Sequence, residues 1–483
     1  MPGCVRRGAG PRVGPAGAAR LVNCNVVDVR SGSVKRGATV CIAGGRIVTV
    51  GSDAPPPVAG EEVIDAGGRH VIPGLIDAHC HVTSSCTFRI RPTEAGRHYR
   101  QLINQLRACV RTGVTTVRDT GGFPRMLARF VDEISRGTLA GPRIVRCNSI
   151  VNVYGGHPDV PPAEMNRFAE IALLFTGKMS LWFETDSELA DGLNGNVEGA
   201  AFVKLTVDDE SIFCGKGRIP AYEDRHLKMI FDFAEHRGLP VVCHCMTKRG
   251  FERMAAYPVR SFEHIVSDEP ITAAQAAAIA QRGTAVVPTM TICEAYMLDG
   301  WRGGFKKGPD NDFVRERLAA KRAYLAAVPE WQCDPEIHKA NMAALRAYKT
   351  IGCAAAARNH KFLPKPRLFH AAATTGVDNL RTLRDAGVTI GVGMDAGTPF
   401  NYFGALHREI DILARLGMTA TEVLRAATFD NARILGVADR LGAVEPGKLA
   451  DLCLLDGNPL QDLSALRRPA MVFEEGRRVH PSS

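Results

Sequence analysis

The feature that most constrains the fold is an apolar run ending in two histidines, Val71-Ile-Pro-Gly-Leu-Ile-Asp-Ala-His-Cys-His-Val82. On a β-strand, side chains at positions i and i+2 lie on the same face, so His79 and His81 would point together from the strand's C-terminal end. Two neutral imidazoles can share a metal ion, and a catalytic zinc needs further protein ligands and an open position for water. Two ordinary histidines near a loop would explain the motif equally well. The choice depends on whether other strands supply the missing ligands.

Strand-like and helix-like segments alternate after this run, which is the pattern of βα units around a parallel sheet. Amphipathic segments such as 221–237 and 271–282 fall between the strands. The strand candidates are 71–78, 114–118, 143–148, 201–207, 239–244, 260–265, 284–289 and 388–393. Eight parallel strands predict an α/β fold of the (β/α)8 TIM-barrel type at residues 71–439, with its active site at the C-terminal ends of the strands.

Both ends of the chain contain short predicted strands outside this alternating region. Residues 19–70 include a hairpin with a Gly-Gly turn, residues 440–483 contain similar strands, and neither segment can close a core alone. We therefore expect the two segments to form one discontinuous β-sandwich, preceded by a disordered basic tail at residues 1–18. An insertion at about 291–375 is rich in Lys and Arg. We expect either a lid over the site or a solvated helical hairpin there.

Composition favours a soluble enzyme over a nucleic-acid-binding or membrane protein. The 483 residues are 45% hydrophobic and 23% charged, and the net charge of +9 comes without a dense Lys/Arg block. No apolar run is long enough to span a bilayer, and the N-terminus lacks the apolar region of a signal peptide. Several of the 14 cysteines lie in strand-like runs and none forms a CxxC pair. These features predict a reducing, cytoplasmic compartment.

Residues able to bind metals lie in or at the ends of several other predicted strands. Lys204 lies inside the apolar segment 201–207, where a charged amine must be paired, neutralised or modified. His244, His264 and Asp395 end later strand candidates. Each of these residues alone is as well explained as a core or loop residue. Together with the histidine pair, however, they would meet at one end of a barrel.

With these residues in place, the sequence resembles the amidohydrolase superfamily of metal-dependent hydrolases, within it the imidazolonepropionase-like and Xaa-Pro dipeptidase-like subgroup. The resemblance runs from about residue 20 to residue 475, and Met394 stands where family members often carry threonine. The matching segments are 71–81, Gly113-Val-Thr-Thr-Val-Arg-Asp119, Gly155-Gly-His157, Phe202-Val-Lys204, His244, Phe262-Glu-His264, Gly393-Met-Asp-Ala-Gly397, 428–432 and Glu445-Pro-Gly-Lys-Leu-Ala-Asp451.

This resemblance implies a centre of two divalent metal ions, with zinc as the expected metal. The more buried ion would be held by His79, His81 and Asp395, and the more exposed one by His244 and His264. Lys204 would bridge both ions as an N-carboxylated side chain, because a carbamate is anionic where an ammonium would be repelled.

The resemblance also implies roles in catalysis. Two metals would activate a water and polarise the substrate carbonyl. Asp395 would accept the water's proton and return it to the leaving nitrogen, as a general base and then an acid. His157 would hold or polarise the substrate carbonyl, and Tyr154 and Arg118 would contact the substrate.

The predicted function is hydrolysis of an amide or related C–N bond in an N-acyl amino acid, dipeptide or carbamate-like substrate. A carboxylate on the substrate would suit the basic insertion, in particular Lys306 and Lys307. The alternatives are a deaminase of a ring compound, which usually works with one metal and no bridging lysine, and a lactonase on the same site. A non-catalytic scaffold protein is a distant alternative, because such relatives typically lose ligands. We expect a small-molecule substrate, no nucleic-acid or membrane partner, and a homo-oligomer.

Overall fold

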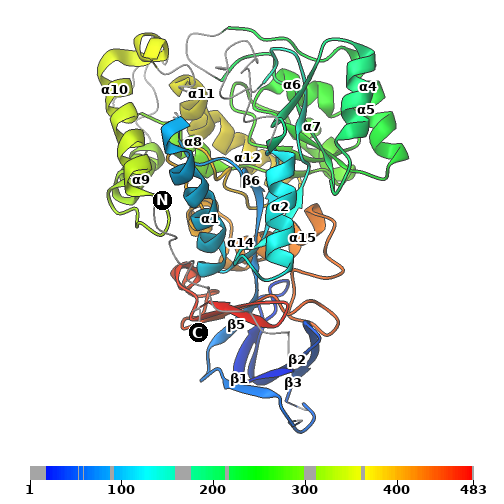
Figure 1. Cartoon of the computed structure of the whole chain (residues 1–483), viewed down its shortest axis with the longest axis vertical. Helices are drawn as coiled ribbons and strands as arrows, with labels where there is room; N and C mark the ends of the chain where they lie inside the picture. Colours follow the sequence, from blue (N-terminus) through cyan, green and yellow to red (C-terminus); the bar gives the residue numbers. More distant parts are fainter. Residues whose placement is uncertain are drawn as a thin grey trace, which may run out of the picture.

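Parallel strands flanked by helices make up most of the molecule, which has an α/β fold (Figure 1). The computed structural model describes residues 18–480 except 53, 58, 88–91, 158–175, 213–216, 299–311 and 360–364. The predicted tail at 1–18 therefore lies almost entirely outside the described residues. None of the helices in these ranges is long and apolar enough to cross a membrane.

One parallel sheet has three strands and carries the histidine pair at its edge. Its strands are β6 (Leu75–Cys80), β7 (Val114–Asp119) and β8 (Arg143–Arg146). The predicted strand at 71–78 is split at Gly74, because β5 (His70–Pro73) belongs to a different sheet. A Cβ at Gly74 would lie 2.1 Å from Thr115 Oγ1, so only glycine fits this crossing point. The helices that follow are α1 (Ala95–Arg111), after a short 3-10 turn at Pro92–Glu94, and α2 (Pro124–Ser135).

A second parallel sheet has six strands and contains most of the other predicted strands. In spatial order they are β10 (Ser180–Phe183), β9 (Ile150–Val153), β11 (Val203–Thr206), β12 (Val241–His244), β13 (Val259–Glu263) and β14 (Ala285–Val287). The helices between them are α4 (Asp186–Gly195), α5 (Asp224–His236), α6 (Lys248–Met254) and α7 (Ala273–Gln281). Threonine capping boxes begin α4 and α7 and satisfy their first backbone amides.

The eighth predicted strand, 388–393, is not a continuous strand, although its backbone is bonded on both sides. Ala78 N donates to Val392 O at 2.9 Å, and Val286 N donates to Thr389 O at 2.9 Å. The segment therefore connects β6 to β14. The side-chain amide of Asn431 interrupts the ladder, because its Oδ1 accepts Val392 N and its Nδ2 donates to Val392 O.

The two ends of the chain share one mixed sheet of eight strands, seen below the helices in Figure 1. Its strands are β1 (Ala19–Val27), β2 (Val34–Ala43), β3 (Arg46–Gly51), β4 (Glu62–Asp65), β5, β15 (Leu452–Leu455), β16 (Met471–Glu474) and β17 (Arg477–His480). β15 pairs with β5 in antiparallel fashion. Leu21, Val40, Leu452 and Phe473 belong to one buried cluster on this sheet, so the N- and C-terminal strands close a core together.

The predicted insertion contains helices that pack against the body of the protein. The helices from this region to the C-terminal sheet are α8 (Met290–Tyr296), α9 (Asp312–Ala326), α10 (Pro335–Asn359), α11 (Pro366–Ala371), α12 (Val377–Asp385), α13 (Leu406–Arg415), α14 (Ala420–Arg425) and α15 (Asn431–Ile434). π-Helical turns precede α12 and α15, and a 3-10 turn occupies Leu463–Arg467. α9 and α10 make up most of the described part of the insertion.

Two basic residues of the insertion are buried and do not contribute to an exposed basic surface. Arg317 and Lys321 of α9 are buried, with exposures of 6% and 5%. Arg317 Nη1 lies 3.5 Å from Glu294 Oε2, and Lys321 Nζ donates to Met297 O at 2.7 Å. Both positive charges therefore have partners inside the protein and do not lie on its surface. Lys306 and Lys307 lie outside the described residues.

Candidate metal centre

Three of the predicted ligands meet at the end of β6. The ligand atoms of His79, His81 and Asp395 all lie within 4.8 Å of one another. His81 Nε2 is 3.2 Å and His79 Nε2 3.7 Å from Asp395 Oδ1. Asp395 reaches the histidines because its backbone N donates to His79 O at 2.7 Å. Segment 388–395 thus places the Asp395 carboxylate beside the imidazoles of His79 and His81.

The backbone is strained where two of the candidate ligands leave their strands. His264 has φ of 72° and Asp395 has φ of 60°, in the left-handed region that side chains other than glycine rarely adopt. Such conformations cost about 1–3 kcal/mol each and persist where surrounding contacts impose them, often at functional sites. Backbone bonds hold both residues, since His264 N donates to Val287 O at 2.9 Å. The strain turns both side chains out of the regular strand pattern.

The other histidines form a second group beside the first. The ring centroids of His244 and His264 lie 4.4 Å apart, and those of His157 and His244 lie 4.2 Å apart in a stacked arrangement. His264 also connects the two groups, because its centroid is 4.9 Å from that of His79. Five histidines from β6, β9, β12 and β13 and the turns that follow them therefore lie close together.

Lys204 of β11 is a buried basic residue of this region. Its side chain is 2% exposed, and Nζ has no hydrogen-bond partner among the described residues. Burial lowers the pKa of Lys204, because the protein interior solvates an ammonium poorly. A buried amine without a partner is costly, whereas a carbamate on Nζ would supply oxygen ligands for cations.

The protonation of the histidines also suits metal binding. Burial holds the pKa values of His79, His157, His244 and His264 well below the usual value, so these rings are neutral at pH 7. Burial acts the same way on His81, but the hydrogen bond and charge of Asp395 outweigh it and raise the pKa of this ring. A neutral imidazole offers the lone pair that a metal requires.

One ring nitrogen of each candidate histidine ligand lies within 3.2 Å of an oxygen atom, by a hydrogen bond for His79, His81 and His264 and by proximity to a carboxylate for His244, which leaves the other nitrogen for a metal. His81 Nδ1 donates to Gly121 O at 2.7 Å, and His264 Nδ1 lies 2.7 Å from Thr289 Oγ1. His79 Nδ1 lies 2.6 Å from Glu263 Oε2, and His244 Nε2 lies 3.2 Å from Asp208 Oδ2. Metal-binding histidines usually have such a partner, which fixes the tautomer and the ring orientation. The donor set therefore fits divalent metal ions.

Arg118 was predicted to contact the substrate, but the structure places it in the buried core. Its side chain is 1% exposed and lies within the core. Nε donates to Ala78 O at 2.6 Å, Nη1 to Ser261 Oγ at 3.0 Å, and Nη2 to Glu263 Oε1 at 2.6 Å. The guanidinium thus supports residues behind His79. A substrate could not reach it without displacing these bonds.

His157 and Tyr154 follow β9. The carbonyl of His157 accepts a 2.5 Å hydrogen bond from Thr206 Oγ1 and a further one from Asn152 Nδ2, which hold its ring against His244. Tyr154 is 39% exposed, which places it at the protein surface near this turn. Its predicted contact with a substrate stays a prediction.

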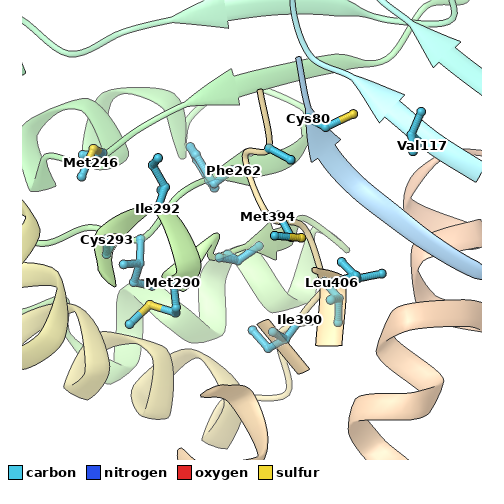
Figure 2. Packing of buried hydrophobic residues seen from close by; sticks show 14 of the residues in the cluster. Cys80, Val117, Met246, Phe262, Met290, Ile292, Cys293, Ile390, Met394 and Leu406 are labelled. Carbon is cyan, nitrogen blue, oxygen red and sulfur yellow. The ribbon is translucent and has the colours of Figure 1, made fainter. Parts of the chain in front are cut away.

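Met394, the position where the sequence departs from the family pattern, belongs to the core. It is 1% exposed and lies in the same buried cluster as Phe262, Ile292 and Leu406 (Figure 2). Met394 is therefore a packing residue of the core, directly before Asp395 in the sequence.

Sequence reasoning missed the polar residues behind the ligands, above all Glu263, Asp208 and Thr289. Glu263 stands between Phe262 and His264 in a segment that matches the family, and Asp208 directly follows the predicted strand 201–207, but neither was assigned a role. The available signal was the cost of burial: Arg118 inside an apolar strand needs an anion, and Glu263 supplies it from 145 positions away.

A His-His-Asp cluster at the ends of parallel strands, with more histidines and a buried lysine beside it, defines a candidate metal-dependent enzyme. The family model "Amidohydrolase family" matches residues 70–479. The chain therefore belongs to the amidohydrolase family and is a hydrolase of that family.

Similar proteins include one relative along most of the chain and shorter matches. An uncharacterized protein of Mycobacterium tuberculosis is 26% identical over 449 residues, 91% of this chain and 91% of that protein. An adenine deaminase of Paracoccus denitrificans is 51% identical over 59 residues, 12% of this chain and 10% of the deaminase. The solved structure of a prolidase complexed with N-methylphosphonate-L-proline has a TM-score of 0.71 at 23% identity, covering 95% of this chain and 99% of the prolidase.

Proposed function

We propose that the protein is a binuclear metal-dependent hydrolase that cleaves an amide or related C–N bond. One observation carries this proposal: Lys204 is buried and has no hydrogen-bond partner in the described structure. It lies on β11 next to β12, which ends in His244, and its charge acts on His79, His244 and His264. His79, His81 and Asp395 would hold the more buried ion, and His244 and His264 the more exposed one. An N-carboxylated Lys204 would bridge the two ions, for which Zn²⁺ is the expected metal.

The protein's own residues would then perform the proton transfers and hold the substrate. Bound divalent ions would supply Lewis-acid activation of water and polarisation of the substrate carbonyl. Asp395 would accept the proton of the attacking water at a carboxylate oxygen and return it to the leaving nitrogen. His157, kept neutral by burial and stacked on His244, would hold the substrate carbonyl.

We infer a substrate with a C–N bond next to a carbonyl, such as an N-acyl amino acid, a dipeptide or a carbamate-like compound. Similarity to a prolidase structure along nearly the whole chain supports the dipeptide class. We propose that the insertion at 291–375 is a lid. One hydrogen bond supports its contact with the loop that follows the histidine pair: Asn341 Nδ2 of α10 donates to Cys86 O at 2.6 Å.

We also propose that the parallel strands close into a (β/α)8 barrel and that 19–70 and 440–483 form a β-sandwich. The bonds of segment 388–393 to both β6 and β14 support closure on one side. On the other side, Ala201 N donates to Arg146 O at 2.8 Å, between the beginning of β11 and the end of β8. A small-molecule substrate, a cytoplasmic location, a homo-oligomeric state and the absence of nucleic-acid and membrane partners stay predictions.

The bridging role of Lys204 can be tested with Lys204→Ala. This variant should lose metal content and activity together, and short carboxylates added at millimolar concentration should restore part of both. Lys321→Ala is the matched control, because Lys321 is equally buried but bonds Met297 O outside the site. Full metal content and activity in Lys204→Ala would refute the bridging lysine.

The reaction can be identified by mass spectrometry of the zinc-loaded protein against pooled N-acyl amino acids, dipeptides, carbamates, lactones and amino-heterocycles. Release of an acid and an amine would support the proposal. A deaminase is the second candidate, favoured by the short match to an adenine deaminase. Replacement of a ring amino group by oxygen would establish deamination and remove the need for a bridged pair of metals.

A further inference from the structure

Two buried carboxylates stand behind the candidate histidine ligands, one for each group. Glu263, at the end of β13, is 0% exposed, and its Oε2 lies 2.6 Å from His79 Nδ1. Asp208, two residues after β11, is 3% exposed, and its Oδ2 lies 3.2 Å from His244 Nε2. We propose that these are separate positioning residues: Glu263 orients His79 for the more buried metal site, and Asp208 orients His244 for the more exposed one. The inference rests on the proposed two-metal centre.

Glu263 is held so that one oxygen remains for His79. Its Oε1 accepts hydrogen bonds from Arg118 Nη2 and Ser261 Oγ, both at 2.6 Å. Arg118 neutralises the buried carboxylate, because both side chains are at most 1% exposed and lie in an environment where a lone charge is costly. Oε2 then accepts the Nδ1 proton of His79. This tautomer leaves Nε2, the nitrogen that faces Asp395, as the metal ligand.

Asp208 is held by different donors. Its Oδ2 accepts Met246 N at 2.8 Å, and its Oδ1 accepts Thr247 N at 3.2 Å and Thr247 Oγ1 at 2.7 Å. Met246 and Thr247 come two and three residues after the end of β12, the strand that ends in His244. The loop after β12 thus holds the Asp208 carboxylate beside His244, the last residue of that strand. Nε2 of His244 is turned toward Asp208, which leaves Nδ1 for a metal.

The two carboxylates share no hydrogen-bond donor, so the metal sites they support should be separable. The donors to Glu263 come from β7, β13 and His79, whereas those to Asp208 come from the loop after β12. Loss of a carboxylate that orients a metal-binding histidine typically costs 10–100-fold in metal affinity. We therefore expect the loss of either carboxylate to lower the affinity for one ion while the other ion stays bound.

The test is a Zn²⁺ titration of the metal-free full chain by calorimetry, with the bound metal counted by mass spectrometry. Wild type should bind two ions. Glu263→Gln and Asp208→Asn should each weaken one ion about 10–100-fold, and the double variant should weaken both. If the two single variants weakened the same ion, or neither, the inference would be overturned. Glu294→Gln is the matched control: Glu294 is 2% exposed and paired with Arg408 and Arg317, and its loss should change neither affinity.

Wild type that binds one ion would contradict the proposed two-metal centre and, with it, the role of Asp208. In that case Glu263→Gln should still lower the affinity for the one bound ion. An unchanged affinity would overturn the positioning role of Glu263 as well. If either variant does not fold, Ser261→Ala and Thr247→Val remove one hydroxyl donor from each carboxylate. Each should weaken its own ion by about fivefold, the effect of one hydrogen bond of about 1 kcal/mol, and unchanged affinities would overturn the inference.

Discussion

At the scale of single residues, Asp395 combines two tasks in the proposed mechanism, as a metal ligand and as the proton carrier. Asp395→Asn keeps the size of the side chain but removes the proton acceptor. Because general acid–base catalysis contributes about 10²–10⁴-fold, we expect kcat to fall by that factor on the substrate found by the screen. Asp439→Asn is the control, since its side chain is 72% exposed. A variant with more than a tenth of the wild-type kcat would exclude proton transfer by Asp395.

His407 of α13 supports a prediction about pH at a distance from the candidate ligands. Burial, assisted by the charges of Arg467 and Arg408, lowers the pKa of His407 to about 3. Below pH 6.5 the unfolded chain takes up a proton at this residue, whereas the folded chain does not, so acid shifts the balance toward unfolding. His407 is partly exposed, so the loss should be smaller than for a fully buried ring. Compared with His407→Gln, wild type should therefore lose less than about 1.4 kcal/mol of stability per pH unit as the pH falls from 6.5 toward 3.

Urea unfolding of both proteins at pH 7.5, 6.5, 5.5 and 4.5 measures this difference. Using the difference is necessary because other buried groups act in the opposite direction: burial raises the pKa of Glu409 to about 7, so this residue stabilises the folded state as pH falls. Parallel stability curves for wild type and His407→Gln would contradict the prediction.

Which residues the sequence could identify depended on whether their partners were local. His79, His81 and Asp395 each end an apolar segment, and their types alone indicate metal chemistry. Arg118 carried the same signal of a polar residue in an apolar strand, but its partner Glu263 lies on a distant strand. Without knowing which strands face each other, a substrate contact and a buried ion pair could not be distinguished.

At the scale of elements, α10 is anchored to the loop after β6 by one buried side chain. Asn341 is 1% exposed, and its Nδ2 donates to Cys86 O at 2.6 Å and to Tyr402 OH at 3.2 Å. Asn341→Ala would leave a buried carbonyl without this partner, and we expect a loss of about 1–3 kcal/mol. The Lys339→Ala control, at a side chain 75% exposed, should stay within about 0.5 kcal/mol of wild type.

Chemical denaturation gives the two free energies, and limited proteolysis reports whether α10 loosens before the rest of the chain. We expect earlier cleavage near α10 in Asn341→Ala alone. Equal protection of both variants would indicate that the helix is held by its apolar contacts, with Asn341 contributing little.

The elements could be predicted where a periodic pattern was long enough. Periodicity located the strands β7, β11, β12 and β13 and the helices α5 and α7. It failed at Gly74, where an uninterrupted apolar run changes sheets, and at 388–393, where the side chain of Asn431 replaces the ladder. Both failures arise from tertiary contacts, a crossing against Thr115 and an amide 39 positions away, that no local pattern contains.

At the scale of the whole molecule, the sheet built from both chain ends supports the strand that carries the histidines. β5 pairs with β15, and Gly74 N donates to Asp451 O at 2.8 Å immediately before β6 begins. The sequence could predict that the two ends belong together, because each contains strands too few to bury a core. The candidate metal centre is therefore connected to the C-terminal strands through one continuous stretch of backbone.

This connectivity leads to a prediction for the stability of the whole chain. The candidate ligands come from β6, β11, β12, β13 and the segment ending in Asp395, so a bound metal would hold elements that are far apart in sequence. A ligand that binds only the folded state stabilises it by RT ln(1 + [L]/Kd), about 2.7 kcal/mol at 100 times Kd. Zn²⁺ added to the chelated protein should therefore raise Tm in proportion to the logarithm of free zinc once the site is filled. The double variant His79→Ala/His81→Ala should lose the part of this rise that comes from the more buried ion, and scanning calorimetry over a series of buffered zinc concentrations measures both curves. An equal rise in wild type and the double variant would place the stabilising zinc away from these histidines.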